Sequence, residues 1–250
     1  MREGHPQSGQ LLLDFPLDPV LLWDNLVVGR HNEVAIAAVQ SLERAGAPGL
    51  ILTGEAGVGK SHLLQAAVQG VRDQHDHHAA VYLDLASLDR HMQGHSKESG
   101  EALLARFVDR YGNCKLAAID ELELLEDAPA LQEAVLYLYN SLRRAGGHLL
   151  GAGRKDPSAM LGLRDDLRSR LLWGAVMPIE QPDETALAGI MAKLADDRQL
   201  KLSDALSHFL LMRLPRSVPL LLESLETLDR EALKLQRPLT VPLAKEVLGL

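Results

Sequence analysis

Eight consecutive residues have the types and the spacing of a phosphate-binding loop. They are Gly54, Glu55, Ala56, Gly57, Val58, Gly59, Lys60 and Ser61. The glycines allow successive backbone N–H groups to turn toward phosphates, Lys60 reaches the β- and γ-phosphates, and the Ser61 hydroxyl ligates Mg²⁺. An apolar run precedes the loop and a helical run follows it from His62, so a ligand-free glycine turn is disfavoured. The sequence therefore predicts a site for ADP or ATP with Mg²⁺, to which His62 also contributes.

An acidic pair follows another apolar run. Asp120 and Glu121 come directly after residues 116–119, and the carboxyl ends of strands are where α/β sheets present ligand sites. We expect Asp120 to orient Mg²⁺ through water and Glu121 to polarise an attacking water. The alternative is an acidic helix N-terminus that only complements the helix dipole.

Five short apolar runs alternate with stretches of helical spacing, at about 49–53, 81–85, 116–119, 148–151 and 175–179. Such alternation predicts an α/β fold with a five-stranded parallel sheet flanked by helices. From Pro182 the pattern is purely helical, at roughly 183–197, 203–214, 219–236 and 240–248. We expect a tail over 1–19, a nucleotide-binding core over 20–180 and a small all-helical lid over 181–250.

Smaller features complete this outline. The polar, glycine-bearing segment 91–100 is expected to be a loop before a helix from Glu101 to Tyr111, and a helix near 130–145 is expected to end at Gly146. Thr240 is expected to cap the last helix, with Pro242 at its first position. The histidine-rich segment 75–78 is expected to be a solvated turn rather than a metal site, because its positions are consecutive.

Composition restricts the possible partners. The 250 residues carry a formal charge of −8 and a pI of about 5.7, so no global basic field favours direct binding to DNA. One cysteine, Cys114, cannot form an internal disulfide, and we find neither a signal sequence nor eighteen consecutive apolar residues. We expect a cytoplasmic protein with no membrane contact, in which any DNA contact is indirect.

Three segments resemble the DnaA branch of the AAA+ ATPases. They are 23–29 (WDNLVVG), 59–64 (GKSHLL) and 167–174 (LRSRLLWG), and the resemblance covers about residues 20–250. It implies that Val27 and Val28 contact the adenine base, although the same residues would also serve as a hydrophobic staple of the first helix. It also implies that Arg170 is an arginine finger that enters the ATP site of a neighbouring subunit, with Arg168 as the second candidate and a plain surface arginine as the alternative.

Two expected polar residues of this family are missing. Ala152 occupies the position of a side chain that senses the γ-phosphate, and Pro219 aligns with the arginine of the lid. Arg216 is the nearest replacement for that arginine. Both departures predict weak hydrolysis of the chain's own nucleotide.

DnaA initiators continue into a helix-turn-helix domain, whereas this sequence ends with the lid. Its tail instead carries Gln10, Leu11, Leu12, Leu13, Asp14 and Phe15, which resembles the peptide that docks into the sliding clamp of DNA polymerase III. Leu13 and Phe15 of an extended peptide would fill one apolar pocket, while Gln10 satisfies its polar rim. The alternative is a tail that packs on its own core.

The combined resemblance is to regulators that bind the clamp and stimulate hydrolysis of DnaA-bound ATP, thereby restraining replication initiation. DNA would be reached only through the clamp, and a homodimer is possible. Two alternatives stay open: a self-acting AAA+ ATPase or helicase-loading motor, and a non-enzymatic adaptor that merely retains its nucleotide.

Overall fold

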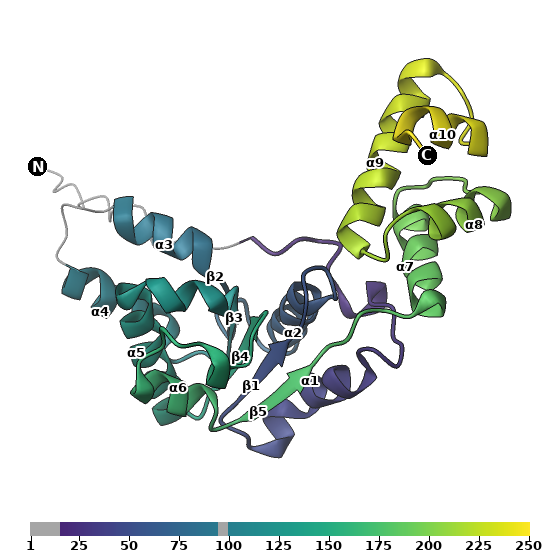
Figure 1. Cartoon of the computed structure of the whole chain (residues 1–250). Coiled ribbons are helices and arrows are strands. Elements are labelled where there is room, and N and C mark those ends of the chain that lie inside the picture. Colours follow the sequence, from purple (N-terminus) through teal and green to yellow (C-terminus); the bar gives the residue numbers. More distant parts are fainter. Residues whose placement is uncertain (1–15, 95–99) are drawn as a thin grey trace, which may run out of the picture.

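A computed structural model of the chain describes residues 16–94 and 100–250. Its centre is a five-stranded parallel sheet in the order β2-β3-β4-β1-β5 (Figure 1). The strands are β1 (Gly49–Thr53), β2 (Ala80–Asp84), β3 (Leu116–Asp120), β4 (His148–Gly153) and β5 (Ala175–Pro178). The five predicted strands and their parallel arrangement are confirmed.

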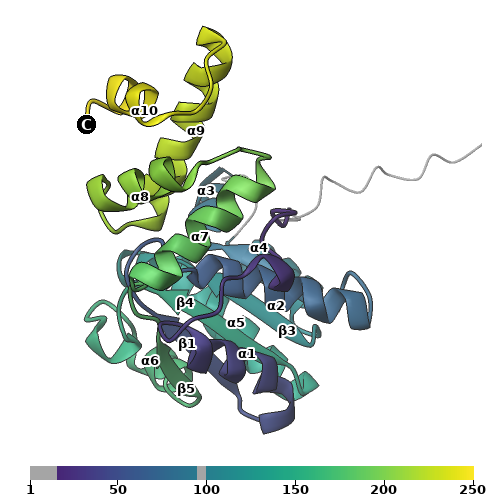
Figure 2. The ribbon, with the colours of Figure 1, turned by 90° about the vertical axis from the view of Figure 1, so that its right-hand side faces the viewer.

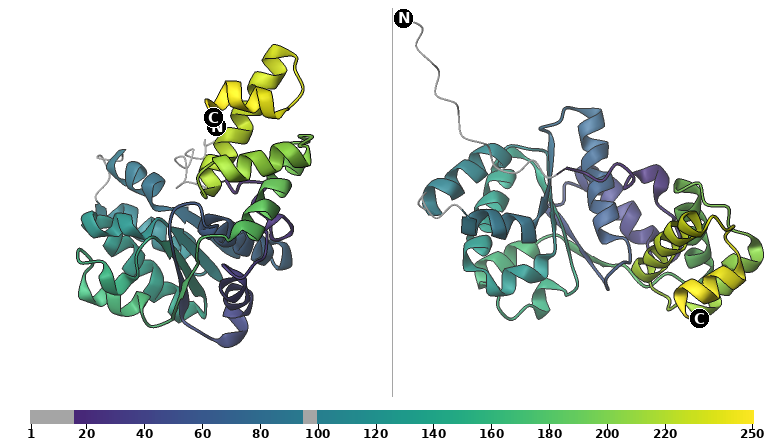
Figure 3. Two further views of the ribbon diagram at one scale, coloured as in Figure 1. Left: turned by 45° about the vertical axis from the view of Figure 1, so that its right-hand side comes forward. Right: turned by 90° about the horizontal axis from the view of Figure 1, so that it is seen from above.

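Helices cover both faces of the sheet (Figure 3). On one face lie α1 (Glu33–Ala45) and α2 (Lys60–Gln74); on the other lie α3 (Leu85–Gly94), α4 (Gly100–Tyr111), α5 (Pro129–Ala145) and α6 (Asp165–Leu171). Three 3₁₀ turns complete the core: η1 (Trp23–Asn25), η2 (Leu122–Asp127) and η3 (Pro157–Ala159). Because both faces are covered, the inner strands are apolar almost throughout, and β3 is buried at all five positions.

A second group of helices forms the lid, which lies beyond one end of the core (Figure 2). It consists of α7 (Glu184–Asp197), α8 (Asp204–Arg213), α9 (Val218–Leu235) and α10 (Val241–Leu248). These helices share their own hydrophobic cluster, centred on leucines such as Leu206, Leu210 and Leu225. Side chains of Asp183, Ser203 and Thr240 cap α7, α8 and α10, respectively, which explains where each helix begins.

Two local predictions are wrong. Residues 91–94 are not a loop, because α3 continues to Gly94; its leucines at 85 and 88 are buried against the core and stabilise the helix. Pro242 occupies the second helical position of α10 rather than the first, since the helix begins at Val241. Among the described residues, no helix is both long and apolar enough to cross a membrane.

Candidate nucleotide site and the Arg170 face

The predicted phosphate-binding loop connects β1 to α2. Gly57 and Gly59 adopt φ angles of 80° and 101°, which L-residues with side chains rarely adopt. The Lys60 ammonium donates hydrogen bonds to the carbonyls of Gly54 and Glu55, each at 2.7 Å. Burial lowers the pKa of Lys60, while the charge of Asp120 opposes that shift. The loop thus presents a cation and the N-terminal end of α2 to the same space, as an anion site requires.

Asp120 lies at the end of β3 with only 5 % of its surface exposed. One carboxylate oxygen accepts a hydrogen bond from the Tyr82 hydroxyl at 2.9 Å, and the other accepts from the Glu121 backbone N–H at 2.9 Å. Glu121 itself adopts a left-handed conformation, with φ 61°. Burial, and then the charges of Asp84 and Asp120, raise the pKa of Glu121. Asp120 and Glu121 therefore have different environments, one fixed and buried, the other exposed.

A cavity of about 430 Å³ opens beside the loop. Three parts of the chain line it: the loop with the start of α2, the segment that precedes α1, and the lid helices α7 and α9. Its lining residues include Asn25, Leu26, Val27, His31, Asn32, Gly57, Lys60, Ser61, His62, Ile190, Lys193, Leu194, Arg198 and Leu222. Such a mixture of apolar walls and a phosphate-binding loop fits a nucleotide whose base lies between core and lid.

The two predicted adenine contacts differ in position. Val27 lines the cavity, and Asn32 stabilises its segment by donating to the Val27 carbonyl and accepting from the Gly29 N–H, each at 2.9 Å. Val28 is 62 % exposed and lies outside the lining. Its predicted contact with adenine stays a prediction.

Arg216, the predicted replacement for the lid arginine, does not line the cavity, and its role stays a prediction. Arg216 precedes α9, is 69 % exposed and pairs with Glu184 at 3.5 Å, outside the cavity lining. The Pro219 ring instead packs directly on the phosphate-binding loop, where it occupies the position of a Cβ on Gly57. At the other sensor position, Ala152 is fully buried. Neither position presents a polar side chain to a phosphate.

Sequence reasoning missed several residues that line the cavity or support it. His31 and Asn32 precede α1, Lys193 lies in α7 and Arg198 directly follows that helix. A polar residue such as Asn32 just before a helix is a recognisable signal. No sequence signal marks Lys193 or Arg198 as a site residue. Each also forms an ordinary ion pair, Lys193 with Asp197 and Arg198 with Glu226.

Ser61 and Asp120 supply too few ligands to bind Mg²⁺ without a nucleotide. In the described part of the chain, no group of three or more His, Cys, Asp or Glu side chains forms a metal site. Ser61 and Asp120 could supply one hydroxyl and one carboxylate, and Mg²⁺ commonly takes its other ligands from phosphates and water. Described residues likewise form no metal site around His75, His77, His78 or His91, and His95 lies outside the described residues.

The two candidate finger arginines lie near the end of α6 but make different contacts. The Arg168 guanidinium donates to the carbonyls of Met160 and Leu163, at 3.0 and 2.9 Å, and pairs with Asp165. Arg170 is half-buried, donates to Asn140 Oδ1 and to the Asp166 carbonyl, each at 2.9 Å, and does not line the nucleotide cavity. The Arg168 guanidinium thus binds the loop before α6. Arg170 is therefore the better candidate for an arginine finger.

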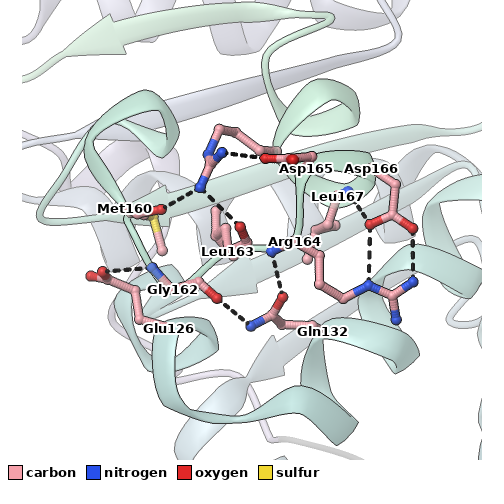
Figure 4. Close-up of polar contacts among 10 residues, drawn as sticks. Glu126, Gln132, Met160, Gly162, Leu163, Arg164, Asp165, Asp166 and Leu167 are labelled. Atoms are coloured by element: carbon pink, nitrogen blue, oxygen red, sulfur yellow. Dashed lines mark hydrogen bonds and ion pairs between the residues drawn. The ribbon is translucent and has the colours of Figure 1, made fainter.

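That loop is fastened to the core by a buried amide (Figure 4). Gln132 of α5 is 3 % exposed; it donates to the carbonyls of Leu125 and Gly162 and accepts from the Arg164 N–H, at 2.7, 2.9 and 2.8 Å. Arg164 pairs in turn with Asp166 at 2.8 Å. Asp166 lies in the first turn of α6. The hydrogen bonds of Gln132 and the ion pair of Arg164 therefore fix the helix that carries Arg170.

The predicted clamp-binding residues Gln10, Leu11, Leu13, Asp14 and Phe15 lie outside the described residues. The described chain begins at Pro16, and Asp18 already lines the nucleotide cavity. The segment that would carry the peptide therefore joins the core beside this site.

Comparison with known structures supports the same fold. Domain III of the DnaA replication initiation protein of Thermotoga maritima superposes with a TM-score of 0.84 at 20 % identity, over 94 % of this chain and 98 % of that one. AMPPCP-bound DnaA of Aquifex aeolicus gives 0.71 at 22 % identity, over 87 % and 68 % of the two chains. The RuvB branch migration motor of Thermotoga maritima superposes with a TM-score of 0.64 at 13 % identity, over 91 % of this chain and 71 % of that one.

Sequence profiles distinguish the two parts of the chain. Residues 17–178 match the bacterial DnaA ATPase domain, and residues 183–248 match the lid domain of Hda. The first match alone covers more than half of the chain. The chain therefore belongs to the DnaA-related AAA+ proteins and carries a lid of the Hda type.

Proposed function

We propose that this chain restrains replication initiation by stimulating hydrolysis of ATP bound to DnaA. It would bind ADP or ATP at residues 54–62, dock on the sliding clamp through its tail, and insert Arg170 into the nucleotide site of DnaA. One observation carries the proposal. The cavity lacks a polar side chain at both sensor positions, Ala152 and Pro219, whereas Arg170 lies on a different part of the surface.

The chain's own nucleotide would have a structural role. It would contact the loop, Val27 and the lid together, and so fix the lid against the core. Lys60 would exchange its bonds to the Gly54 and Glu55 carbonyls for bonds to phosphate oxygens, and Ser61 with Asp120 would hold Mg²⁺. An AMPPCP-bound relative supports an adenine nucleotide here. The Mg²⁺ ion would neutralise phosphate charge.

Arg170 would act on the partner's nucleotide. Its two hydrogen bonds go to neutral acceptors, the Asn140 amide oxygen and the Asp166 carbonyl. An anionic phosphate oxygen would accept a stronger bond from the same guanidinium. A guanidinium there would stabilise the charge that develops on the γ-phosphate, which is worth roughly 10³-fold or more in rate.

The decisive experiment measures hydrolysis of DnaA-bound ATP with and without clamp-loaded DNA. Arg170→Ala is expected to abolish stimulation while clamp binding and folding are retained. Arg144→Ala is the matched control, because Arg144 is an exposed arginine in the last turn of the neighbouring helix α5. Retained stimulation by Arg170→Ala would exclude the proposed finger.

The tail is tested separately. Changing Gln10, Leu13 and Phe15 together to alanine is expected to abolish clamp capture and, with it, clamp-dependent stimulation. Undiminished capture would remove the clamp from the proposed function.

A second candidate is a self-acting ATPase or motor, favoured by Glu121 next to Asp120, since a raised pKa makes Glu121 a better base. Turnover by the isolated chain on the order of 1 s⁻¹, which is typical of the slower enzymes, would favour it. Negligible turnover together with unchanged DnaA hydrolysis would instead indicate a non-enzymatic adaptor.

A further inference from the structure

Buried side chains connect Asp120 to the backbone at Asp18. The Tyr82 hydroxyl donates to Asp120 Oδ2 at 2.9 Å. The Gln65 side chain lies next to the Tyr82 hydroxyl, and its Oε1 accepts from the Asp18 backbone N–H at 2.7 Å. Tyr82 and Gln65 are 9 % and 8 % exposed, respectively. The connection therefore runs through the protein interior rather than through solvent.

The elements explain why these groups meet. Tyr82 lies on β2 and pairs in register with Ala118 of β3, two residues before Asp120. Because side chains alternate along a strand, Ala118 and Asp120 share a face with Tyr82, and the small Ala118 side chain leaves room for the phenol ring. Gln65 comes from α2, which packs on this face and starts at Lys60.

The chemistry gives the hydrogen bond between Tyr82 and Asp120 one direction. An ionised carboxylate has no hydrogen to donate, so the Tyr82 hydroxyl is the donor and Asp120 the acceptor. Both Asp120 oxygens are then engaged, one by Tyr82 and one by the Glu121 N–H. A carboxylate with a donor on each oxygen has a fixed orientation, and its remaining lone pairs are available to a ligand.

We propose that Tyr82 and Gln65 are positioning residues that orient Asp120 toward Mg²⁺ bound with a nucleotide and tie this carboxylate to the chain at Asp18. The proposal rests on the nucleotide site proposed above and is independent of DnaA. It implies that Mg²⁺ strengthens nucleotide binding through Tyr82. It also implies that Mg²⁺ with nucleotide stabilises the backbone where the N-terminal segment joins the core.

The first test measures the Kd for ADP by calorimetry, in Mg²⁺ and in EDTA, on the full chain. Tyr82→Phe is expected to weaken binding in Mg²⁺ by about tenfold, as loss of a hydrogen bond to a charged group predicts, and to leave binding in EDTA unchanged. Tyr139→Phe is the matched control, because Tyr139 is also buried and its hydroxyl has no hydrogen-bond partner among the described residues. In an Asp120→Asn background, Tyr82→Phe is expected to have no further effect.

Other results overturn the proposal. Equal weakening in Mg²⁺ and in EDTA would indicate a merely structural role for Tyr82, and an unchanged Kd in both would indicate none. Absence of ADP binding by the unaltered chain would instead refute the nucleotide site itself, and this inference with it.

The second test follows hydrogen exchange of the Asp18 amide, which donates to Gln65. Mg²⁺ with ADP is expected to slow this exchange several-fold relative to ADP in EDTA, and Gln65→Leu is expected to remove the difference. Exchange that does not respond to Mg²⁺ would refute the connection to the N-terminal segment.

Discussion

The nucleotide side of the molecule and the Arg170 face use their polar groups differently. Beside the phosphate-binding loop, Lys60 donates to two neighbouring carbonyls and Ser61 is exposed, so these groups are available to a ligand. On the other face, Gln132 and Arg168 use most of their hydrogen-bonding groups to hold a loop in place. Among the described residues that line the nucleotide cavity, none comes from α6.

Under the proposed function, this difference would separate nucleotide binding from the activation of DnaA-bound ATP hydrolysis. A nucleotide binds where polar groups surround a cavity, whereas an arginine that acts on another protein needs a rigid base and an exposed end. Arg170 has both, because the network around Gln132 fixes α6 and the Arg170 side chain is only half-buried.

Lys60→Ala is the strongest test of the nucleotide side. Loss of the loop cation is expected to weaken ADP binding by at least about 100-fold, since a charge-assisted bond to phosphate disappears. A saturating nucleotide stabilises a protein by about 4 kcal/mol at 1,000 times its Kd, so the ligand-induced rise in Tm should vanish in this variant. An unchanged rise would mean that the nucleotide binds elsewhere.

Arg168→Ala and Arg170→Ala should separate a structural arginine from a functional one. Removing Arg168 leaves the buried Leu163 carbonyl without its donor and the Met160 carbonyl with only the Leu163 N–H. We expect this to cost about 2 kcal/mol of unfolding free energy. Arg170→Ala should cost less than about 1 kcal/mol, because Arg170 is half-exposed and its partners can turn to water. Urea denaturation of both variants checks this order, and equal losses would contradict it.

Gly57→Ala tests the contact between the lid and the phosphate-binding loop. A Cβ on Gly57 would overlap the Pro219 ring, and φ is 80°. Gly46→Ala is the control, since Gly46 has φ 61° but no described atom within 4 Å of its Cβ position. We expect about 1 kcal/mol of destabilisation for Gly46→Ala, a clearly larger loss for Gly57→Ala, and weaker nucleotide binding only for the latter.

The smallest predicted effect is a dependence of stability on pH. Burial lowers the pKa of both His31 and His62 below the ordinary value of 6.5. Below pH 6.5 the unfolded chain therefore binds more protons than the folded chain. The contribution of the two histidines to the free energy of unfolding is fully present above that pH and is lost as the pH decreases. Urea midpoints at about pH 7.5 and 5.5 should differ less in a His31→Gln, His62→Gln variant than in the unaltered chain.

The strands could be predicted from the sequence because each is a short apolar run between polar segments. The end of α3 could not, since His91 and Gln93 look polar and its stability comes from the burial of Leu85 and Leu88. Arg198 illustrates the same limit at the site. Only the orientation of α7 brings it to the cavity, whereas Arg216, which is nearer to the expected position along the chain, points elsewhere.

The sequence by itself determined the phosphate-binding loop, the parallel sheet and the helical lid, because glycine spacing and hydrophobic periodicity are local properties of the chain. Only the tertiary structure distinguished Arg168 from Arg170. Two residues apart on a helix point about 200° away from each other, so one meets the loop carbonyls and the other meets Asn140. The link from Tyr82 to Asp120 likewise depends on the pairing of β2 with β3, which joins residues 38 positions apart.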